Sequence, residues 1–198
     1  MQLSTPLILA SRSPRRVGLL RQIGWNPEVR PCDIPELIDP ALSPEENART
    51  LALQKARCVA QNVQKGITIG ADTIVVLNEH LLGKPEDPED AVRMLSTLSG
   101  KTHTVITGIA LVESPGGRSL TDAESTLVTF RNLPEPEIRE YVAGGSPMDK
   151  AGAYGIQDDY GAVFVTRIEG CYYNVMGLPL ARLYQRLMEF SESYKRDM

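Results

Sequence analysis

The chain of 198 residues has few residues of the kinds that mark several common protein classes. It contains two histidines, His80 and His103, which excludes a histidine-rich metal site. No apolar run approaches the roughly 20 residues that a membrane-spanning helix needs. The three cysteines, Cys32, Cys58 and Cys171, are odd in number and far apart, so they fit neither a zinc motif nor a disulfide framework. We therefore expect them to be structural thiols in a reducing compartment.

Signals for export and for binding large anionic surfaces are also missing. The N-terminus has no basic region followed by an apolar core, so no signal peptide is predicted and we expect a cytoplasmic protein. The net charge of −4 gives no general attraction to nucleic acid or to an anionic membrane, so any basic site must be local. The chain is 42% hydrophobic and 23% charged, which is ordinary for a globular protein that buries a substantial core.

The first candidate site is the hexapeptide Ser11–Arg16, which lies between a strand-like run, Leu7–Ala10, and a helical pattern. Ser13 is a suitable N-cap for that helix. The first turn then carries Arg15 and Arg16, where acidic residues are usual. Free backbone N–H groups and guanidinium groups at one point indicate an anion site, and phosphate is the anion we favour. A solvated basic turn on the surface is the alternative.

The second candidate is Lys55, on a helix that Ser43-Pro-Glu-Glu is expected to start. Lys55 falls within the apolar stripe of this helix, four residues after Leu51 and four before Val59. A buried lysine is costly unless an anion or a cleft receives its ammonium group. The alternative, that the side chain reaches out to a nearby edge, stays open.

The third candidate is Asp72, in the middle of the most strand-like segment, residues 67–77. Its preceding neighbours on the same strand face, Gly70 and Thr68, leave space rather than fill it. A carboxylate in such a place indicates a cleft that holds a metal, a water molecule or a cationic partner. A buried, hydrogen-bonded aspartate that caps a turn is the alternative.

The rest of the chain alternates between strand and helix patterns. Lys84, between Gly83 and Pro85, is a second candidate phosphate ligand. His103 is expected to be structural, and the irregular segment 146–157 has the composition of a compact functional loop. Two further helices are expected, one from Pro88 toward Ser99-Gly100 and one from Pro134 to Gly144-Gly145. The other expected elements are a hairpin of residues 102–113 and 119–131, a strand over 162–168, a closing amphipathic helix over 176–190 and a frayed tail over 191–198.

These features occur in an ordered set that resembles the Maf family of nucleotide pyrophosphatases, from about Leu7 to Phe190. The motifs that carry the resemblance are Ser11-Arg-Ser-Pro-Arg-Arg16, Gly70-Ala-Asp-Thr73, Gly83-Lys-Pro85, Ser99-Gly100 with His103, Asp149-Lys-Ala-Gly-Ala-Tyr-Gly-Ile-Gln157 and Gly177-Leu-Pro179. The resemblance implies one catalytic domain over residues 1–198. It also implies a two-lobed α/β fold like that of the inosine triphosphate pyrophosphatases (Maf/Ham1-like), with a long curved mixed sheet and a central cleft.

The resemblance also implies the chemistry. We expect hydrolysis of a nucleoside triphosphate, dTTP or UTP, to the monophosphate and pyrophosphate with a divalent cation, Mg²⁺ or Mn²⁺. Whether the physiological substrate is a normal or a modified pyrimidine nucleotide stays open, and so does a homodimer. By matching positions, Asp72 is the catalytic proton acceptor. The specificity positions are Arg15, Thr73 and Gln157, and the residues that line the phosphates and the metal are Ser11, Arg16, Lys55 and Lys84.

Two segments depart from the pattern of the family. Many relatives carry paired acids where this chain reads Asp33-Ile-Pro-Glu36, so a metal bound by Asp72 would have Glu36 or Asp33 as its second ligand. After Gln157, glycine is common in relatives, whereas this chain has Asp158-Asp159, which is expected to reshape the rim of the base pocket.

The sequence leaves two other functions open. A nucleotidyltransferase also has an early strand followed by an arginine-containing loop, but it typically has a longer glycine-rich segment. A nucleotide-sensing regulator of cell division, with little turnover, is the alternative from another class. Asp72, Lys84 and Gln157 together favour catalysis.

Overall fold

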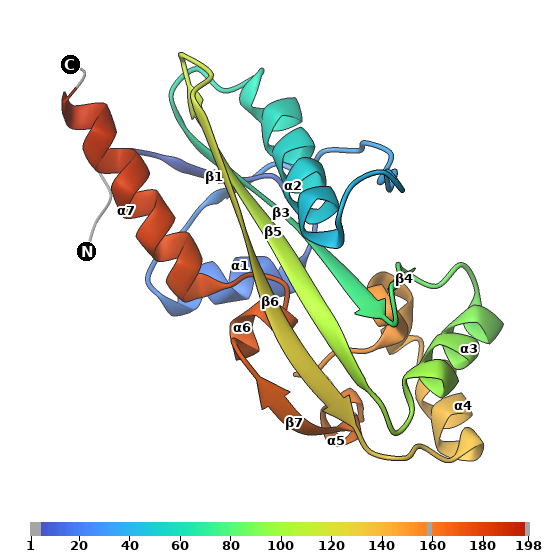
Figure 1. The fold of residues 1–198 in the computed structure, drawn as a ribbon. Helices are drawn as coiled ribbons and strands as arrows, with labels where there is room; N and C mark the ends of the chain where they lie inside the picture. Colours follow the sequence, from blue (N-terminus) through green and yellow to red (C-terminus); the bar gives the residue numbers. More distant parts are fainter. Residues whose placement is uncertain (1–4, 158–159, 197–198) are drawn as a thin grey trace. The chain divides into compact units, whose positions relative to one another are not determined.

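The computed structural model describes residues 5–157 and 160–196 (Figure 1). The chain divides into two compact units. The first unit comprises residues 1–72, 107–124 and 177–198, and the second comprises residues 73–106 and 125–176. Among the described residues, no helix has the length and apolar character needed to cross a membrane.

Seven strands in the described part of the chain form a mixed sheet, which confirms the α/β class. They are β1 (Leu7–Leu9), β2 (Glu28–Val29), β3 (Gly66–Leu77), β4 (His80–Leu82), β5 (Thr102–Ser114), β6 (Ser119–Phe130) and β7 (Val165–Glu169). The strand order is β2-β1-β3-β5-β6-β7, with β4 also paired to β3. Strand β1 runs parallel to β2 and β3, whereas β4 is antiparallel to β3 and β7 is antiparallel to β6.

The helices follow the sequence patterns closely over the first two thirds of the chain. Seven α-helices are described: α1 (Pro14–Gln22), α2 (Pro44–Ala60), α3 (Pro88–Leu98), α4 (Glu135–Ala143), α5 (Gly161–Phe164), α6 (Tyr172–Val175) and α7 (Leu180–Arg196). Two 3₁₀ turns, η1 (Ser146–Asp149) and η2 (Ala151–Ala153), lie in the segment expected to be an irregular loop.

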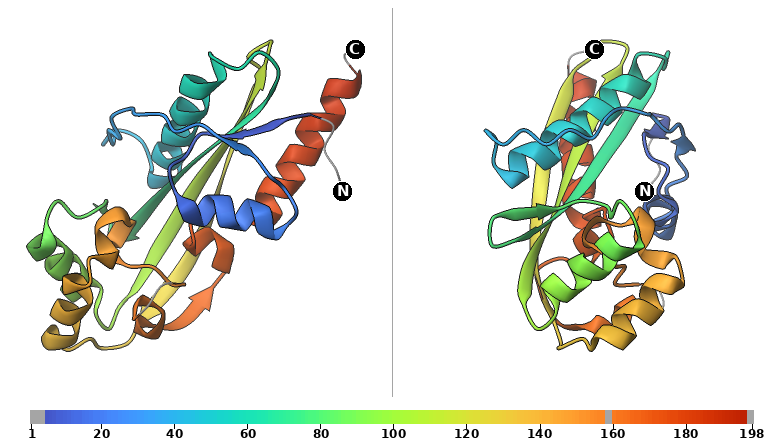
Figure 2. Two further views of the ribbon diagram at one scale, coloured as in Figure 1. Left: turned by 180° about the vertical axis from the view of Figure 1, so that it is seen from behind. Right: turned by 90° about the vertical axis from the view of Figure 1, so that its right-hand side faces the viewer.

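In the first unit, α2 covers one face of the strands and α1 and α7 cover the other (Figures 1 and 2). Small residues let α2 approach the strands closely. A Cβ atom on Gly70 of β3 would lie 2.1 Å from the carbonyl oxygen of Ala52, and one on Gly108 of β5 would lie 2.2 Å from that of Ala48. The space beside Gly70 is therefore taken by the backbone of α2. This close packing brings Lys55 of α2 down to the strands.

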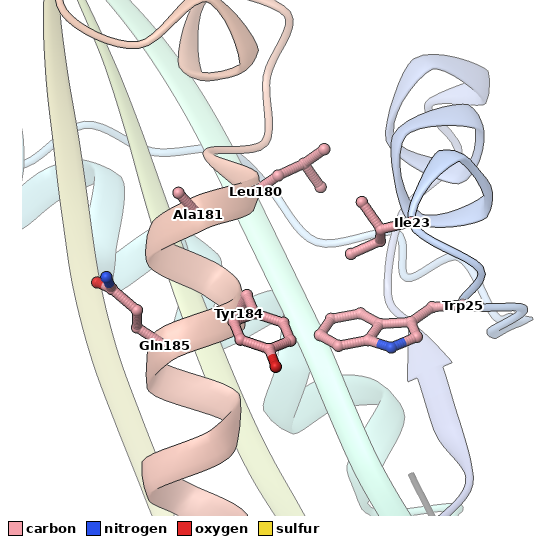
Figure 3. Close-up of a pocket in the computed structure, with 6 residues that line it drawn as sticks. All are labelled: Ile23, Trp25, Leu180, Ala181, Tyr184 and Gln185. Atoms are coloured by element: carbon pink, nitrogen blue, oxygen red, sulfur yellow. The ribbon is translucent and has the colours of Figure 1, made fainter. Parts of the chain in front are cut away.

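Within the first unit, helix α7 packs against the segment after α1 partly through aromatic residues. Trp25, just after α1, stacks on Tyr184 of α7 with ring centroids 5.8 Å apart. Figure 3 shows the cavity beside this pair, which has a volume of about 470 Å³ and is lined by Ile23, Trp25, Leu180, Ala181, Tyr184 and Gln185. Its lining includes none of the candidate site residues.

The second unit has its own apolar core, to which β3, α3, β5, β6, α4 and the segment after η1 all contribute. Aromatic rings lie at its centre, and Phe130, Tyr141, Tyr154 and Phe164 contact one another edge to face. Segment 153–156 is buried in this core and contributes Ala153, Tyr154 and Ile156 to it. The loop that was expected to be functional is thus held firmly by packing.

Three expectations for the last third of the chain are wrong. The strand expected over 162–168 begins only at Val165, because residues 161–164 form the helical turn α5. The closing helix expected over 176–190 begins at Leu180, after the separate turn α6. The tail, expected to be frayed from residue 191, continues α7 to Arg196. Polar composition does not stop a helix that is already nucleated, since each added residue gains a backbone hydrogen bond.

The expectation of three structural thiols is also wrong. Cys32 and Cys58 form a disulfide, with their Cα atoms 6.3 Å apart, and Cys171 is free. The two bonded residues are separated by 26 positions, but the fold brings the segment after β2 against α2. Spacing along the sequence could not reveal this pairing, because it depends on tertiary structure.

Candidate active site

The register of two parallel strands directs the arginine-bearing hexapeptide toward Asp72. Leu9 at the end of β1 pairs with Ile69 of β3, and the N–H of Ala10 donates to the carbonyl oxygen of Ile69 at 2.8 Å. Continuing this register by two residues brings Ser11 level with Ala71, the residue before Asp72. Ser11 and Asp72 are both buried, with 7% and 6% of their surface exposed.

The first turn of α1 forms as the sequence predicts. The Ser13 side chain accepts from the N–H of Arg16, and proline stands at the first helical position. The guanidinium of Arg16 donates to Ser11 Oγ at 3.2 Å and to the carbonyl oxygen of Gly177 at 2.8 Å. Arg12 is instead paired with Asp33 at an exposed position. The hydrogen bonds thus fix the Arg16 side chain beside Ser11.

Lys55 lies between two carboxylates. Its ammonium nitrogen is 2.5 Å from Asp72 Oδ1 and 2.6 Å from Glu36 Oε1. The side chains of Lys55 and Asp72 are only 10% and 9% exposed, whereas that of Glu36 is 39% exposed. Of the two readings of Lys55, the one with an anionic partner is correct, and Asp72 likewise has a cationic partner. The chain thus builds a buried ion pair with a third, more open carboxylate beside it.

Burial and charge act in opposite directions on Asp72. Burial raises the pKa of the Asp72 carboxyl above its ordinary value, and nearby Glu36 acts in the same direction, whereas Lys55 and Arg16 oppose them. For Arg16, burial lowers the pKa and Asp72 opposes that effect. Both groups therefore lie in one electrostatic cluster in the first unit, where a buried carboxylate is balanced by two cations.

Two carboxylates of this cluster can hold a divalent cation. Asp72 and Glu36 direct one oxygen each at the same point, now taken by the ammonium of Lys55. Asp33 is engaged by Arg12, so the geometry favours Glu36 as the second ligand. In the described residues, no group of three or more His, Cys, Asp or Glu side chains could hold a metal. Two carboxylates completed by phosphate oxygens and water is the ligand set that Mg²⁺ commonly takes, so the residues fit.

The second unit holds Thr73, Lys84 and Gln157. The N–H of Gly152 donates to the carbonyl oxygen of Gly83 at 2.9 Å, so the segment before Gln157 is bonded to the turn that carries Lys84. Nε2 and Oε1 of Gln157 are both buried, and neither has a hydrogen-bond partner among residues 5–157 and 160–196. Buried polar atoms without a hydrogen-bond partner are rare in folded proteins, so the two amide atoms of Gln157 require an explanation.

Some contacts of the site carry no signal in the sequence. Arg16 donates to the carbonyl oxygen of Gly177, which lies 161 positions further along the sequence. The hydrogen bonds from Lys55 to Asp72 and Glu36 depend on how α2 packs. The expected effect of Asp158-Asp159 on the rim of the base pocket lies outside the described residues.

Comparisons with known proteins agree with these motifs. A family model described as "Maf-like protein" matches residues 6–190. A protein of Salinibacter ruber named "dTTP/UTP pyrophosphatase" is 49% identical over 187 residues, which cover 94% of this chain and 92% of the relative. Proteins of the same name from Carboxydothermus hydrogenoformans and Moorella thermoacetica are each 48% identical to this chain. Each alignment covers 93% of this chain, and the two alignments cover 98% and 94% of the respective relatives.

Among solved structures, the Ham1 protein of Staphylococcus aureus is similar with a TM-score of 0.45 and 16% identity. The match covers 63% of this chain and 71% of the Ham1 chain.

Proposed function

Because the chain belongs to the Maf family, we propose that it hydrolyses dTTP and UTP to the nucleoside monophosphate and pyrophosphate. The observation that carries this proposal is the near full-length similarity, at 48–49% identity, to relatives that bear the name dTTP/UTP pyrophosphatase. Normal and modified pyrimidine nucleotides share the same base edge and triphosphate, so both are included in the proposed substrate class.

Asp72 is proposed as the catalytic proton acceptor. Its carboxylate orients a water molecule toward the α-phosphorus and takes a proton from it as pyrophosphate leaves. The ion pair with Lys55 supports this role, because it opposes the effect of burial and favours the ionised form of Asp72. A base with a pKa above that of an ordinary aspartate is also a stronger proton acceptor.

The cationic and hydroxyl side chains are proposed to bind the triphosphate. Ser11 and Arg16 lie together at the start of α1, next to Arg15, and Lys84 follows β4. Phosphoryl transfer needs positioning and neutralisation of charge more than covalent chemistry from the protein. Preorganised guanidinium and ammonium groups supply that stabilisation where charge develops on the leaving pyrophosphate.

A divalent cation, Mg²⁺ or Mn²⁺, is the proposed cofactor, with Asp72 and Glu36 as its protein ligands. When bound, it would neutralise phosphate charge and help to orient the triphosphate. Without the cation, Lys55 holds the two carboxylates together. Binding is testable without turnover: Mg²⁺ should raise the Tm of the wild-type protein and have a smaller effect on Glu36→Gln.

Gln157 is proposed to read the base, with Arg15 and Thr73 as the further specificity positions. One amide offers a donor and an acceptor, which match O4 and N3–H of uracil or thymine. Cytosine presents the reverse pattern at these two positions, so it would leave polar groups unpaired. The unmatched, buried amide of Gln157 supports this role.

The wider setting follows from the substrate. We propose that the two units act as one catalytic domain, and that the protein works in the cytoplasm, where nucleoside triphosphates are made and used. This proposal rests on the substrate and not on the cysteines, since Cys32 and Cys58 are bonded.

The test is a product-resolved assay of UTP and dTTP hydrolysis with Mg²⁺ and with Mn²⁺. Asp72→Asn keeps the shape of the side chain and should lower kcat by about 10²- to 10⁴-fold, the usual contribution of a general base. Asp87→Asn makes the same chemical change at an exposed carboxylate that caps α3, where asparagine caps equally well, and should stay near wild type. Near-normal turnover by Asp72→Asn would show that the assignment of Asp72 is wrong.

A further inference from the structure

A buried histidine in the second unit is absent from the mechanism above. His103, near the start of β5, is 2% exposed. Its Nε2 and the hydroxyl of Tyr154 share a hydrogen bond of 2.8 Å. The imidazole also meets the rings of Phe130 and Tyr154 edge to face, with centroids 4.9 Å and 5.4 Å apart. His103 therefore fixes both the ring and the hydroxyl of Tyr154.

Tyr154 belongs to the segment that carries Gln157, three positions further along the chain. Two further hydrogen bonds hold this segment: the N–H of Gly155 donates to the Tyr141 hydroxyl at 3.3 Å, and the N–H of Gly152 donates to the Gly83 carbonyl oxygen at 2.9 Å. Ala153 has a φ of 61°, which is unfavourable for a residue with a Cβ atom. A strained turn of this kind keeps its shape only where its surroundings hold it.

The position of the Gln157 amide depends on this backbone. Its two polar atoms have no hydrogen-bond partner in the described part of the chain, so no hydrogen bond there orients the side chain. What sets the amide in place is then packing and the course of segment 153–156, and Tyr154 is the largest buried side chain in that segment. A shift of Tyr154 would be passed directly to Gln157.

We propose that His103 is a positioning residue for base recognition: by its hydrogen bond and ring contacts with Tyr154, it sets the backbone from which Gln157 meets the pyrimidine. The proposal rests on the proposed function in one respect, namely that Gln157 reads the base. His103 touches no substrate in this account and acts only through Tyr154. Its loss should therefore change the choice of base more than the rate of the chemical step.

The experiment measures kcat/KM for UTP and for CTP with the full-length protein. His103→Leu replaces the imidazole with an apolar side chain of similar size that cannot form a hydrogen bond, and Tyr154→Phe removes only the hydroxyl. Each should lower the UTP:CTP ratio by roughly tenfold, since displacing a group by a fraction of an ångström to 1 Å costs up to about 10²-fold. His103→Gln, whose amide can reach the same hydroxyl, should restore most of the ratio.

Thr126→Val is the matched control for a lost buried hydroxyl in the same unit. Thr126 Oγ1 is buried and accepts from the N–H of Cys171 at 3.0 Å and from Asn174 Nδ2 at 2.9 Å. These partners lie outside segment 150–157, so the loss of the hydroxyl should reduce stability without altering the UTP:CTP ratio. Thermal unfolding of all variants separates a general loss of stability from a change in selectivity.

The outcomes separate this inference from the proposed function. If Gln157→Leu lowers the ratio but His103→Leu and Tyr154→Phe leave it unchanged, the positioning role is refuted and base reading by Gln157 survives. If Gln157→Leu leaves the ratio unchanged, base reading by Gln157 is refuted, and the positioning role with it. If the ratio falls equally in Thr126→Val, the effect of His103 is merely structural and the inference is overturned.

Discussion

Replacing Lys55 with methionine removes an ammonium group that two carboxylates share. Methionine has a similar length and keeps an apolar stem in the stripe of α2, so the change is close to a pure loss of charge and hydrogen bonds. In the wild-type protein the ammonium lies 2.5 Å from Asp72 and 2.6 Å from Glu36. The variant leaves Asp72, with a side chain only 9% exposed, without its main cationic partner.

The expected loss of stability comes mainly from Asp72. Removing one partner of a buried ion pair typically costs about 3–5 kcal/mol, because the other charge stays buried. Glu36 is 39% exposed, and water can solvate it in the variant, so it adds little. Arg16 still stabilises the charged form of Asp72 against the effect of burial, so we expect a cost near the lower end of the range of about 3–5 kcal/mol. We expect about 3 kcal/mol, or a fall in Tm of about 6–12 °C for a chain of this length.

The loss should depend on pH, with a definite sign. Burial raises the pKa of Asp72 above its ordinary value of 3.8, and removing Lys55 raises this pKa further. A carboxyl whose pKa is raised on folding contributes stability that is present below pH 3.8 and is lost as the pH rises through the raised pKa. The difference in free energy of unfolding between wild type and Lys55→Met should therefore be small at acidic pH and should increase toward pH 8.

Thermal unfolding of the wild type, Lys55→Met and the control Lys65→Met, across a pH series, measures both effects. Lys65 is exposed, and its replacement should change Tm little. Adding Asp72→Asn to Lys55→Met should recover much of the lost stability, since the buried carboxylate is then neutral. If Lys55→Met has the same Tm as Lys65→Met at pH 8, or if its loss of stability relative to wild type is the same at every pH, the account of the buried pair is wrong.

The remaining predictions concern packing, a buried histidine and the disulfide. Gly70→Ala should destabilise the protein by about 1–3 kcal/mol in urea unfolding, because its Cβ would lie 2.1 Å from the Ala52 carbonyl oxygen and overpack the unit. Burial lowers the pKa of His103 from 6.5 to about 4, so its neutral form contributes stability above pH 6.5 that is lost as the pH falls toward 4. In urea unfolding, the free energy of unfolding of the wild type should therefore exceed that of His103→Gln by an amount that shrinks by roughly 3 kcal/mol as the pH falls from 6.5 to 4. Cys58→Ser, or a dithiol reductant, should lower stability by about 3 kcal/mol by opening the bond to Cys32, and equal Tm values with and without reductant would contradict this.

Much of the fold could be predicted from the sequence because local signals and tertiary structure agree there. Ser13 and Ser43 cap α1 and α2 as their positions predict, and proline follows each cap. The long apolar run of β3 is buried on both faces, as a central strand should be. Where the signal was composition alone, as in the polar tail, the prediction failed, since α7 continues to Arg196.

The sequence could nominate residues for the candidate site, but it could not predict the contacts among them. The sequence indicated that Lys55 and Asp72 are each unusual in an apolar element, and a charged partner was one of two interpretations for each. It could not show that they are partners of each other. That pairing depends on Gly70 and Ala52 bringing α2 against β3. The Cys32 pairing with Cys58 was missed for the same reason, because it too is a product of tertiary packing.

Hydrolysis of UTP in water enriched in ¹⁸O tests the central claim most directly. If Asp72 directs water to the α-phosphorus, mass spectrometry should find the label in UMP and none in the pyrophosphate. The label should become undetectable over the same time with Asp72→Asn. Label in pyrophosphate or in inorganic phosphate, or UDP as the nucleotide product, would contradict the account.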